Sequence, residues 1–379
     1  MCLYAIDTNS DMLYYFSNIA IRYILGGFYM INWKWRVIIT LIAFCCIIFI
    51  FTACNNGSTD DIDEETTIVP VVYIAGGCTD SSYKYIPCYW KDGVKTDLPG
   101  GYGSGNQIAV SEGSIYVAGS YKDGTKDIAC YWKNGIKTDL YVGTGDSSAS
   151  SIAVSGGSVY IAGNYWVDST RIPCFWKDGV KTDLPAGTGT AYAASIAVLN
   201  ESVYVVGFYF EGFTIACYWK DGVKIDLIDV RSQASAIFVS GGSVYIAGNY
   251  NNGTYMACYW KDGVKTDLPA EAGNSYTLEA ITASGNSVYI AGKYYNTSTY
   301  KTTPCYWKDS VKTDLNLTTE FDYWAGGIAI FDGSVYITGC YTNDNIYLKA
   351  CYWKDGIKVD LTGGSFDSWA SGIAVINGK

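Results

Sequence analysis

Two phrases decide the fold of this chain: Ser158-Val-Tyr-Ile-Ala-Gly163 and Cys174-Phe-Trp-Lys-Asp-Gly-Val-Lys-Thr-Asp-Leu184. Each phrase recurs seven times in close variants, and successive copies lie 41 to 47 residues apart. The tyrosine of the first phrase stands at positions 73, 116, 160, 204, 245, 289 and 336, and the tryptophan of the second at 90, 132, 176, 219, 260, 307 and 353. A fixed period of this length indicates a solenoid, a propeller or another repeat array.

Each copy contains four segments with strand character, which lie between residues 151 and 184 in the third copy. Asp178-Gly179 separates the last two segments, and this dipeptide favours a type I′ hairpin turn because both residues accept a positive φ. Four short strands per repeat are typical of a propeller blade, and no copy has the 3.6-residue apolar period of a helical solenoid. The sequence therefore predicts an all-β fold, a seven-bladed β-propeller with four antiparallel strands per blade.

The two ends of the repeat region are out of phase. The first copy begins at its second strand, at residues 71–76, and the chain ends on a surplus first strand at residues 372–375. A C-terminal strand placed in this way can complete the first blade and close the ring through backbone hydrogen bonds. We therefore expect residues 71–379 to form one closed propeller.

The second phrase resembles the HAF-type extracellular repeats of bacteria, whose units combine an aromatic residue before tryptophan, an Asn/Asp-Gly turn and a Thr-Asp-Leu; residues 174–184 match this pattern. The Tyr-Ile-Ala-Gly strand is more distantly similar to kelch blades, although the kelch double glycine is absent after most copies of that strand. The resemblance implies a propeller and an extracellular location, and it brings no catalytic residues with it.

Residues 1–54 differ in composition from the repeats. Lys34 and Arg36 precede an apolar run of seventeen residues, 37–53, that ends in Thr-Ala before Cys54. This order is typical of a secretory signal, and its end resembles the lipobox of bacterial lipoproteins, where signal peptidase II cuts before an acylated cysteine. The resemblance implies an exported protein anchored to the bacterial membrane or cell surface by lipid on Cys54. A single transmembrane anchor is the alternative, because the run lies at the lower limit for a membrane span.

Two shorter segments complete the N-terminal region. Met30 fits the start of a signal better than Met1, so we interpret residues 1–29 as an extension from a wrongly assigned start. Residues 55–70 hold five acidic residues and no basic one, a composition that predicts a solvated tether between the anchor and the propeller.

Composition narrows the classes of function. The chain has no histidine, which is the usual general base, the commonest metal ligand and the usual partner of a serine or cysteine nucleophile. Arg171 and Arg231 alone lie in the repeats, too few for the arginine cluster of propeller sialidases. The net charge of −10 without a basic stripe argues against nucleic acid. We expect a monomer that is not an enzyme and needs no metal or cofactor, with two-carboxylate glycoside hydrolysis as the remaining enzymatic alternative.

The residues that recur in every copy have structural interpretations. We expect the tryptophans to pack between blades, and the cysteine of each second phrase to be a buried free thiol. Equivalent atoms of neighbouring blades should be roughly 10 Å apart, whereas a disulfide needs Cα atoms within about 7 Å. Cys78 and Cys340 follow the second strand in the first and seventh copies, which a closed ring makes neighbours. A disulfide between them is therefore an alternative to two free thiols. The aspartate that ends each fourth strand is expected to accept backbone N–H groups of the next turn.

One face of the propeller is expected to display variable connectors, those between the second and third strands and between the fourth and first. Variable loops on a repeated scaffold usually hold binding specificity, and aromatic side chains among polar ones suit sugars or peptides. We predict a binding module for glycan or protein on this face, with a structural or assembly scaffold as the alternative. The candidate ligand-binding residues are Tyr165, Trp166, Tyr209, Tyr250, Tyr294, Tyr323, Trp324, Phe366 and Trp369.

Overall fold

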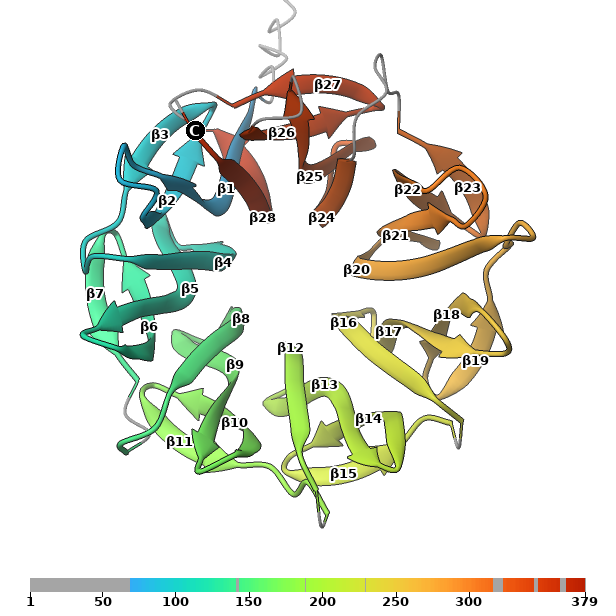
Figure 1. The fold of residues 1–379 in the computed structure, drawn as a ribbon, viewed down its shortest axis with the longest axis horizontal. Helices are drawn as coiled ribbons and strands as arrows, with labels where there is room; N and C mark the ends of the chain where they lie inside the picture. The colour runs from blue at the N-terminus through green and yellow to red at the C-terminus, as the bar shows by residue number, and fades with distance from the viewer. Residues whose placement is uncertain are drawn as a thin grey trace, which may run out of the picture. The chain divides into compact units, whose positions relative to one another are not determined.

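The computed structural model describes residues 69–378 apart from 141–142, 188, 229, 316–322, 344–346 and 362–365. The described residues form seven four-stranded sheets and no helix, and none of them belongs to a helix that could cross a membrane. The sheets stand as blades around one axis, which confirms the predicted seven-bladed β-propeller (Figure 1). Cys54, the signal-like run and the acidic segment up to residue 68 lie outside the described residues.

Each blade has four antiparallel strands, ordered from the axis to the rim. The blades are numbered in chain order by their second strands, so that blade 1 contains β28, β1, β2 and β3, and blade 2 contains β4 to β7. The inner strands are β4 (Gly103–Ser111), β8 (Ser147–Ser155), β12 (Ala191–Leu199), β16 (Ser232–Ser240), β20 (Asn274–Ser284), β24 (Tyr323–Phe331) and β28 (Ser368–Gly378). The second strands are β1 (Val69–Thr79), β5 (Ser114–Asp123), β9 (Ser158–Val167), β13 (Ser202–Glu211), β17 (Ser243–Asn251), β21 (Ser287–Asn296) and β25 (Ser334–Asn343).

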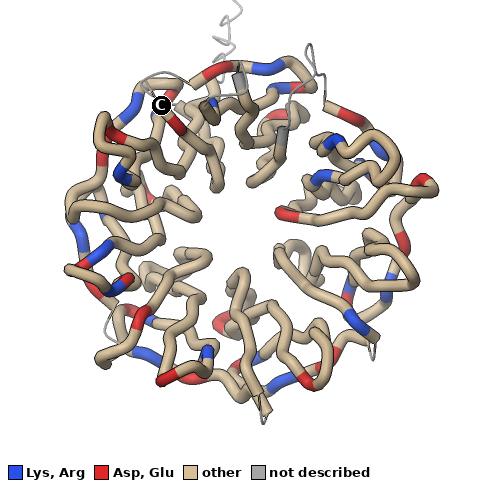
Figure 2. Tube along the Cα trace, in the orientation of Figure 1, with Lys and Arg blue, Asp and Glu red and all other residues tan. Residues whose placement is uncertain are grey.

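The two remaining strands of each blade complete the sheet toward the rim. The third strands are β2 (Tyr85–Lys91), β6 (Lys126–Lys133), β10 (Thr170–Lys177), β14 (Phe213–Lys220), β18 (Tyr255–Lys261), β22 (Lys301–Lys308) and β26 (Tyr347–Lys354). The outer strands are β3 (Val94–Asp97), β7 (Ile136–Asp139), β11 (Val180–Asp183), β15 (Val223–Asp226), β19 (Val264–Asp267), β23 (Val311–Asp314) and β27 (Ile357–Asp360). Most charged residues lie on these outer strands and in the loops, and few lie on the inner strands (Figure 2).

The ring closes through a strand pair formed by the two ends of the repeat region. β28 is the inner strand of blade 1, and it pairs with β1 from Val69↔Gly378 to Cys78↔Ser368. The closing strand is longer than the predicted 372–375, because its first residues also pair with β1. This pairing confirms that the C-terminal strand completes the first blade.

The repeated tryptophans form the contacts between blades. All seven are 0–1% exposed. Trp132 of blade 2, for example, packs in one cluster with Tyr73 and Leu98 of blade 1. The repeated cysteines are buried free thiols, as predicted. Cys78 and Cys340 are also buried free thiols, so the structure contains no disulfide between them.

The tight turns between third and outer strands have the predicted conformation. Asp178 and Gly179 have φ angles of 50° and 83°, and Ser310 takes the glycine position of blade 6 at 66°. The Asp178 carboxylate also accepts the backbone N–H of Val159 at 2.8 Å, which ties the turn to the second strand. Asp or Asn makes the same bond in each blade, so this residue both forms the turn and fixes the hairpin beside it.

A β-bulge interrupts every inner strand where it passes the glycine of Tyr-Ile-Ala-Gly. At Gly119, a Cβ atom would lie 1.9 Å from the Ser104 carbonyl oxygen and 3.1 Å from the Trp132 ring. The register shifts at this level, between Gly105 and Gln107, so that Asn106 has no partner in the pairing. A bulge of this kind turns its extra residue out of the sheet. The repeated glycine is therefore required by close packing against the bulge and the tryptophan.

Deleting residues 372–379 tests ring closure. The deletion removes most of β28, including buried Ile373, and leaves an edge of β1 unpaired. Truncating one buried isoleucine usually costs about 2–5 kcal/mol, so we expect a larger loss and no single cooperative melting transition by circular dichroism. Removing Lys379 alone is the control. An unchanged melt after the longer deletion would contradict closure by β28.

Candidate functional site

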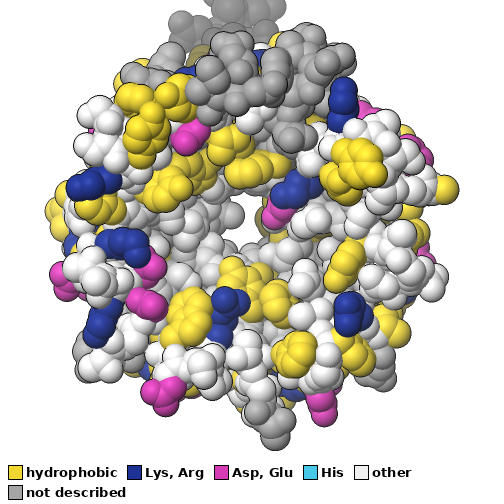
Figure 3. Space-filling model, in the orientation of Figure 1, with side chains coloured by type: hydrophobic (Ala, Val, Ile, Leu, Met, Phe, Trp, Pro, Cys, Tyr) yellow, Lys and Arg dark blue, Asp and Glu magenta, His cyan; other side chains and the backbone are white. Residues whose placement is uncertain are grey.

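The bulges of the inner strands build a cavity around the axis, which we call the axial mouth. It has a volume of about 660 Å³ and opens at the centre of the ring (Figure 3). The residues that the bulges leave unpaired line it, two in blade 7 and one in each other blade: Asn106, Ser150, Ala194, Ser235, Glu279, Gly326, Gly327 and Ser371. The mouth is therefore lined by the residues that the bulge directs toward the axis.

Polar side chains of the mouth bond from blade to blade. Asn106 donates to the Ala149 carbonyl at 2.8 Å, and Ser235 donates to the Leu278 carbonyl at 2.6 Å. These bonds cross from blade 2 to blade 3 and from blade 5 to blade 6. These bonds fix the side chains in orientation at the wall of the cavity.

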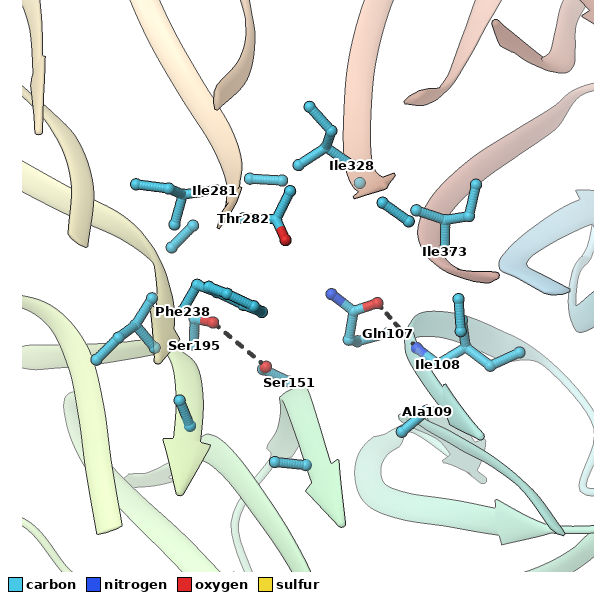
Figure 4. A pocket seen from close by; sticks show the side chains of 18 of the residues that line it. Gln107, Ile108, Ala109, Ser151, Ser195, Phe238, Ile281, Thr282, Ile328 and Ile373 are labelled. Carbon is cyan, nitrogen blue, oxygen red and sulfur yellow. Dashed lines mark hydrogen bonds between the residues drawn. The ribbon is translucent and has the colours of Figure 1, made fainter. Parts of the chain in front are cut away.

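Beyond the bulges, the axis continues as a channel of about 580 Å³ with a mixed polar and apolar lining. Ile281, Ile328 and Ile373 line it, and Gln107 and Phe238 project toward its centre (Figure 4). Hydroxyl and amide groups of Gln107, Ser151, Ser195 and Thr282 lie among these apolar side chains. A polar ligand would therefore find partners both at the mouth and in the channel.

A charged pair and an indole lie together in the mouth. Lys293 donates to the Glu279 carboxylate at 2.9 Å, and its ammonium lies 5.5 Å from the centre of the Trp324 ring. Trp324 is 39% exposed, unlike the buried tryptophans of the blades. This corner offers a ligand an aromatic surface, a carboxylate and an ammonium group within one wall.

A shallow aromatic groove adjoins the mouth above blades 1 and 2. It has a volume of about 290 Å³ and is lined by Tyr85, Tyr102 and Trp369. The rings of Tyr85 and Trp369 meet edge to face at 5.4 Å. Ser104 and Ser120 line both the groove and the mouth, so the two hollows adjoin at these residues.

Four of the predicted binding tyrosines lie at the ends of second strands, against the outer strands. Tyr165 shows the arrangement: its hydroxyl donates to Asp183 at 3.1 Å, and Lys181 lies 3.8 Å from its ring centre and 2.8 Å from the same carboxylate. Tyrosine, lysine and aspartate recur in this way in blades 2 to 7. The predicted residues placed in such triads are Tyr165, Tyr209, Tyr250 and Tyr294.

The triads correct the expected role of the repeated aspartate. We expected this residue to accept backbone N–H groups, but it binds the lysine two residues earlier and the tyrosine hydroxyl instead. Burial alone would lower the pKa of Lys181, yet its hydrogen bonds to Asp183 and Tyr165 outweigh burial and raise that pKa. Residues i and i+2 of a strand share a face, which brings the lysine beside the carboxylate.

The other predicted binding residues are dispersed over the same face. The Arg171 guanidinium carbon lies 4.8 Å from the centre of the Trp166 ring, and Phe366 packs against Tyr83 and Tyr347. Trp324 lines the mouth and Trp369 lines the groove. Tyr323 begins β24, and its side chain lies outside the described atoms. The structure therefore brings Trp324 and Trp369 to adjoining hollows and leaves the others elsewhere.

Blade 1 departs from the triad. The position of the tyrosine is taken by Cys78, whose sulfur accepts a hydrogen bond from Lys95 at 3.3 Å. A hydrogen bond from Cys88, followed by the hydrogen bond and charge of Lys95, lowers the pKa of the Cys78 thiol. In blade 5, by contrast, burial raises the pKa of Cys258 to about 12.

The bulge residues were missed by reasoning from sequence. A signal for them exists: each stands two positions before the isoleucine of the inner strand, as in Asn106-Gln-Ile108 and Glu279-Ala-Ile281. That position changes from copy to copy, from asparagine and serine to alanine, glutamate and glycine. The variable connectors drew attention to loops, whereas this variable inward position lies inside a strand.

Comparison with known proteins supports the fold alone. No family model and no curated protein matches the chain. A puromycin-hydrolysing peptidase of Mycobacterium tuberculosis is similar in structure, with 11% identity and a TM-score of 0.52, over 76% of this chain and 53% of the peptidase. The β-propeller domain of the Trilobed protease from Pyrococcus furiosus is similar with 11% identity and a TM-score of 0.50, over 78% of this chain and 93% of that domain. This chain thus spans about half of the peptidase. The Pyrococcus propeller is described as having an open velcro topology, whereas here β28 pairs with β1.

Neighbouring alanines of β12 test the bulge geometry. Ala194 is the bulge residue of blade 4 and faces the mouth, whereas Ala193 is 0% exposed in the core. We expect Ala194→Trp to change the free energy of unfolding by no more than about 0.5 kcal/mol, and Ala193→Trp to lower it by about 3 kcal/mol or more. Urea unfolding of both variants measures this. Equal destabilisation would mean that Ala194 does not face the cavity.

Proposed function

We propose that this propeller is a carbohydrate-binding module whose site is the axial mouth with the adjoining aromatic groove. The observation that favours this function most is the exposed indole of Trp324 beside the Glu279–Lys293 pair, in a cavity lined by hydroxyl and amide groups. Ligand sites typically combine a concave apolar surface with a few well-placed polar groups.

The chemistry of the mouth matches a sugar ring. One face of a pyranose presents C–H groups that can pack on an indole, and its edge presents hydroxyls that both donate and accept hydrogen bonds. Glu279 can accept and Lys293 can donate at the same wall. The serines and Asn106 that line the remaining circumference offer further partners of both kinds.

The adjacency of mouth and groove favours a chain of several sugars over a single one. Trp324 and Trp369 lie in the two hollows, and Ser104 and Ser120 lie in both. An oligosaccharide with one residue in the mouth and the next ones over Tyr85 and Trp369 would use both aromatic surfaces. A folded protein partner, the other ligand considered from the sequence, would press on the rim and leave the concave mouth unfilled.

We propose that the module works outside the cell, attached to the bacterial membrane by lipid on Cys54, as the lipobox-like ending and the HAF-type repeats suggest. In this arrangement residues 55–70 act as the tether, and the acidic charges keep it solvated. A lipid-anchored module would hold extracellular glycan, including the glycan of a neighbouring envelope, close to the cell.

A glycan array with the purified protein tests the ligand class. We expect oligosaccharides to bind, and Trp324→Ala to weaken the best of them at least about tenfold, or 1.4 kcal/mol, because the stacking surface is lost. Ala194→Trp should abolish binding by filling the mouth. Val264→Ala, at an exposed position of outer strand β19, is the matched control and should bind normally.

The outcomes separate the alternatives. An array without hits, together with specific capture of a protein, would replace the glycan proposal with a protein-binding or scaffold role. Cleavage of the bound oligosaccharide, seen by mass spectrometry and lost in Glu279→Gln, would make the protein a glycoside hydrolase. Binding that survives both Trp324→Ala and Ala194→Trp would place the site outside the mouth.

Replacing Cys54 with alanine tests the anchor. The variant should keep its N-terminal segment and lack lipid, because signal peptidase II acts on acylated cysteine. Mass spectrometry of the membrane fraction measures both. A wild-type protein that retains residues 37–53, or that ends in an unmodified Cys54, would rule out the lipoprotein assignment. Firm anchoring needs more than one acyl chain, so a fully acylated cysteine is the expected form.

A further inference from the structure

We propose that Cys78, Cys88 and Asp97 in blade 1 form a binding site for a thiophilic metal ion of the Zn²⁺ class. The site is separate from the axial mouth and does not depend on the carbohydrate proposal. It is carried by three neighbouring strands, because Cys78 belongs to β1, Cys88 to β2 and Asp97 to β3.

The strand register explains why these donors meet. Cys88 pairs with Gly76 of β1 on one side and with Asp97 of β3 on the other, so Gly76, Cys88 and Asp97 form one row across the blade. Cys78 follows Gly76 by two residues and therefore points to the same face. The glycine provides no side chain to separate the thiols. The two sulfurs and a carboxylate oxygen of Asp97 lie within 4.8 Å of one another.

Blade 1 is set apart from its six copies by this cluster. In blades 2 to 7 the position of Cys78 is a tyrosine that contacts the lysine and aspartate of the outer strand, as Tyr121 does with Lys137 and Asp139. Those blades hold one thiol and one carboxylate at this place. Among residues 69–378 with the stated gaps, the cluster in blade 1 is the one group of three such donors.

The separations are compatible with a metal ion. Zinc binds sulfur at about 2.3 Å and carboxylate oxygen at about 2.0–2.2 Å, so tetrahedral donors lie roughly 3.5–3.8 Å apart. The three donor atoms lie within 4.8 Å of one another, so small movements bring them into that range. Two thiolates with one carboxylate select thiophilic ions over Mg²⁺ or Ca²⁺. Three protein donors leave the fourth position to water.

The Lys95 ammonium contacts two of the three donors that would bind the metal ion. Its ammonium lies 3.3 Å from the Cys78 sulfur and 3.0 Å from Asp97. The Lys95 side chain is 20% exposed and the Asp97 side chain 56% exposed, so the ammonium can move into solvent beside the carboxylate. Metal binding would then form two metal–sulfur bonds and one metal–oxygen bond and release the thiol protons to solvent.

Titration with Zn²⁺ and Cd²⁺ tests the site. The full-length protein and its variants are titrated in chelator-free buffer with a phosphine reductant, by calorimetry for Zn²⁺ and by the thiolate-to-metal absorption of Cd²⁺. Cys78→Tyr restores the residue of the other blades, so it should fold normally and bind one equivalent less than wild type. Cys340→Ala removes a buried thiol elsewhere and should leave the stoichiometry unchanged.

Lys95→Met gives the proposal a second readout. Because the ammonium competes with the metal for the same partners, its removal should tighten binding by about tenfold. A merely structural cluster would give no such gain. The proposal is overturned if wild type and Cys78→Tyr bind the same number of ions, or if Lys95→Met weakens the binding of the equivalent that Cys78→Tyr loses.

Discussion

The structure depends on one close approach that recurs in every blade, where the second strand has no room for a side chain. A Cβ atom at Gly119 would lie 1.9 Å from the Ser104 carbonyl oxygen, and one at Gly163 would lie 2.2 Å from that of Ser148 and 2.7 Å from the Trp176 ring. Glycine lets the bulged inner strand and the interblade tryptophan press against the same point. The propeller can be packed tightly because its seven blades repeat this contact.

The same contact separates the residues that specify the fold from those available for function. The bulge fixes the backbone of its extra residue but leaves the side chain over the axis, where Asn106, Ala194 and Glu279 are all accommodated. Variation there costs the blade little, because these side chains are not part of the interblade core. The side chains that line the axial mouth can thus differ from blade to blade, although the repeat itself is nearly uniform. Trp324, beside the bulge of blade 7, adds the aromatic surface to it.

The repeat pattern was sufficient to predict the architecture, whereas the site could be found only from the folded structure. Blade number, strand order, the buried Trp176 and closure by the last strand follow from period, turn chemistry and phase, all of which are local or countable. The convergence of bulge residues is a property of the closed ring, and the diagonal meeting of Cys78 with Cys88 is a property of register. Sequence spacing directed attention to Cys340 as a partner, although strand pairing brings Cys88 to Cys78 instead. The tyrosines expected to bind ligand, such as Tyr165, are engaged by the outer strand because lysine and aspartate share its face.

Under the proposed function, the axial mouth is where this propeller meets its ligand. Hydrogen–deuterium exchange, followed by mass spectrometry with and without the best-binding oligosaccharide, tests it without relying on any substitution. We expect added protection in peptides from the inner strands around Asn106, Glu279 and Trp324, and none in the Asp-Gly turns such as Asp178-Gly179. Protection confined to those turns or to the outer strands would contradict it.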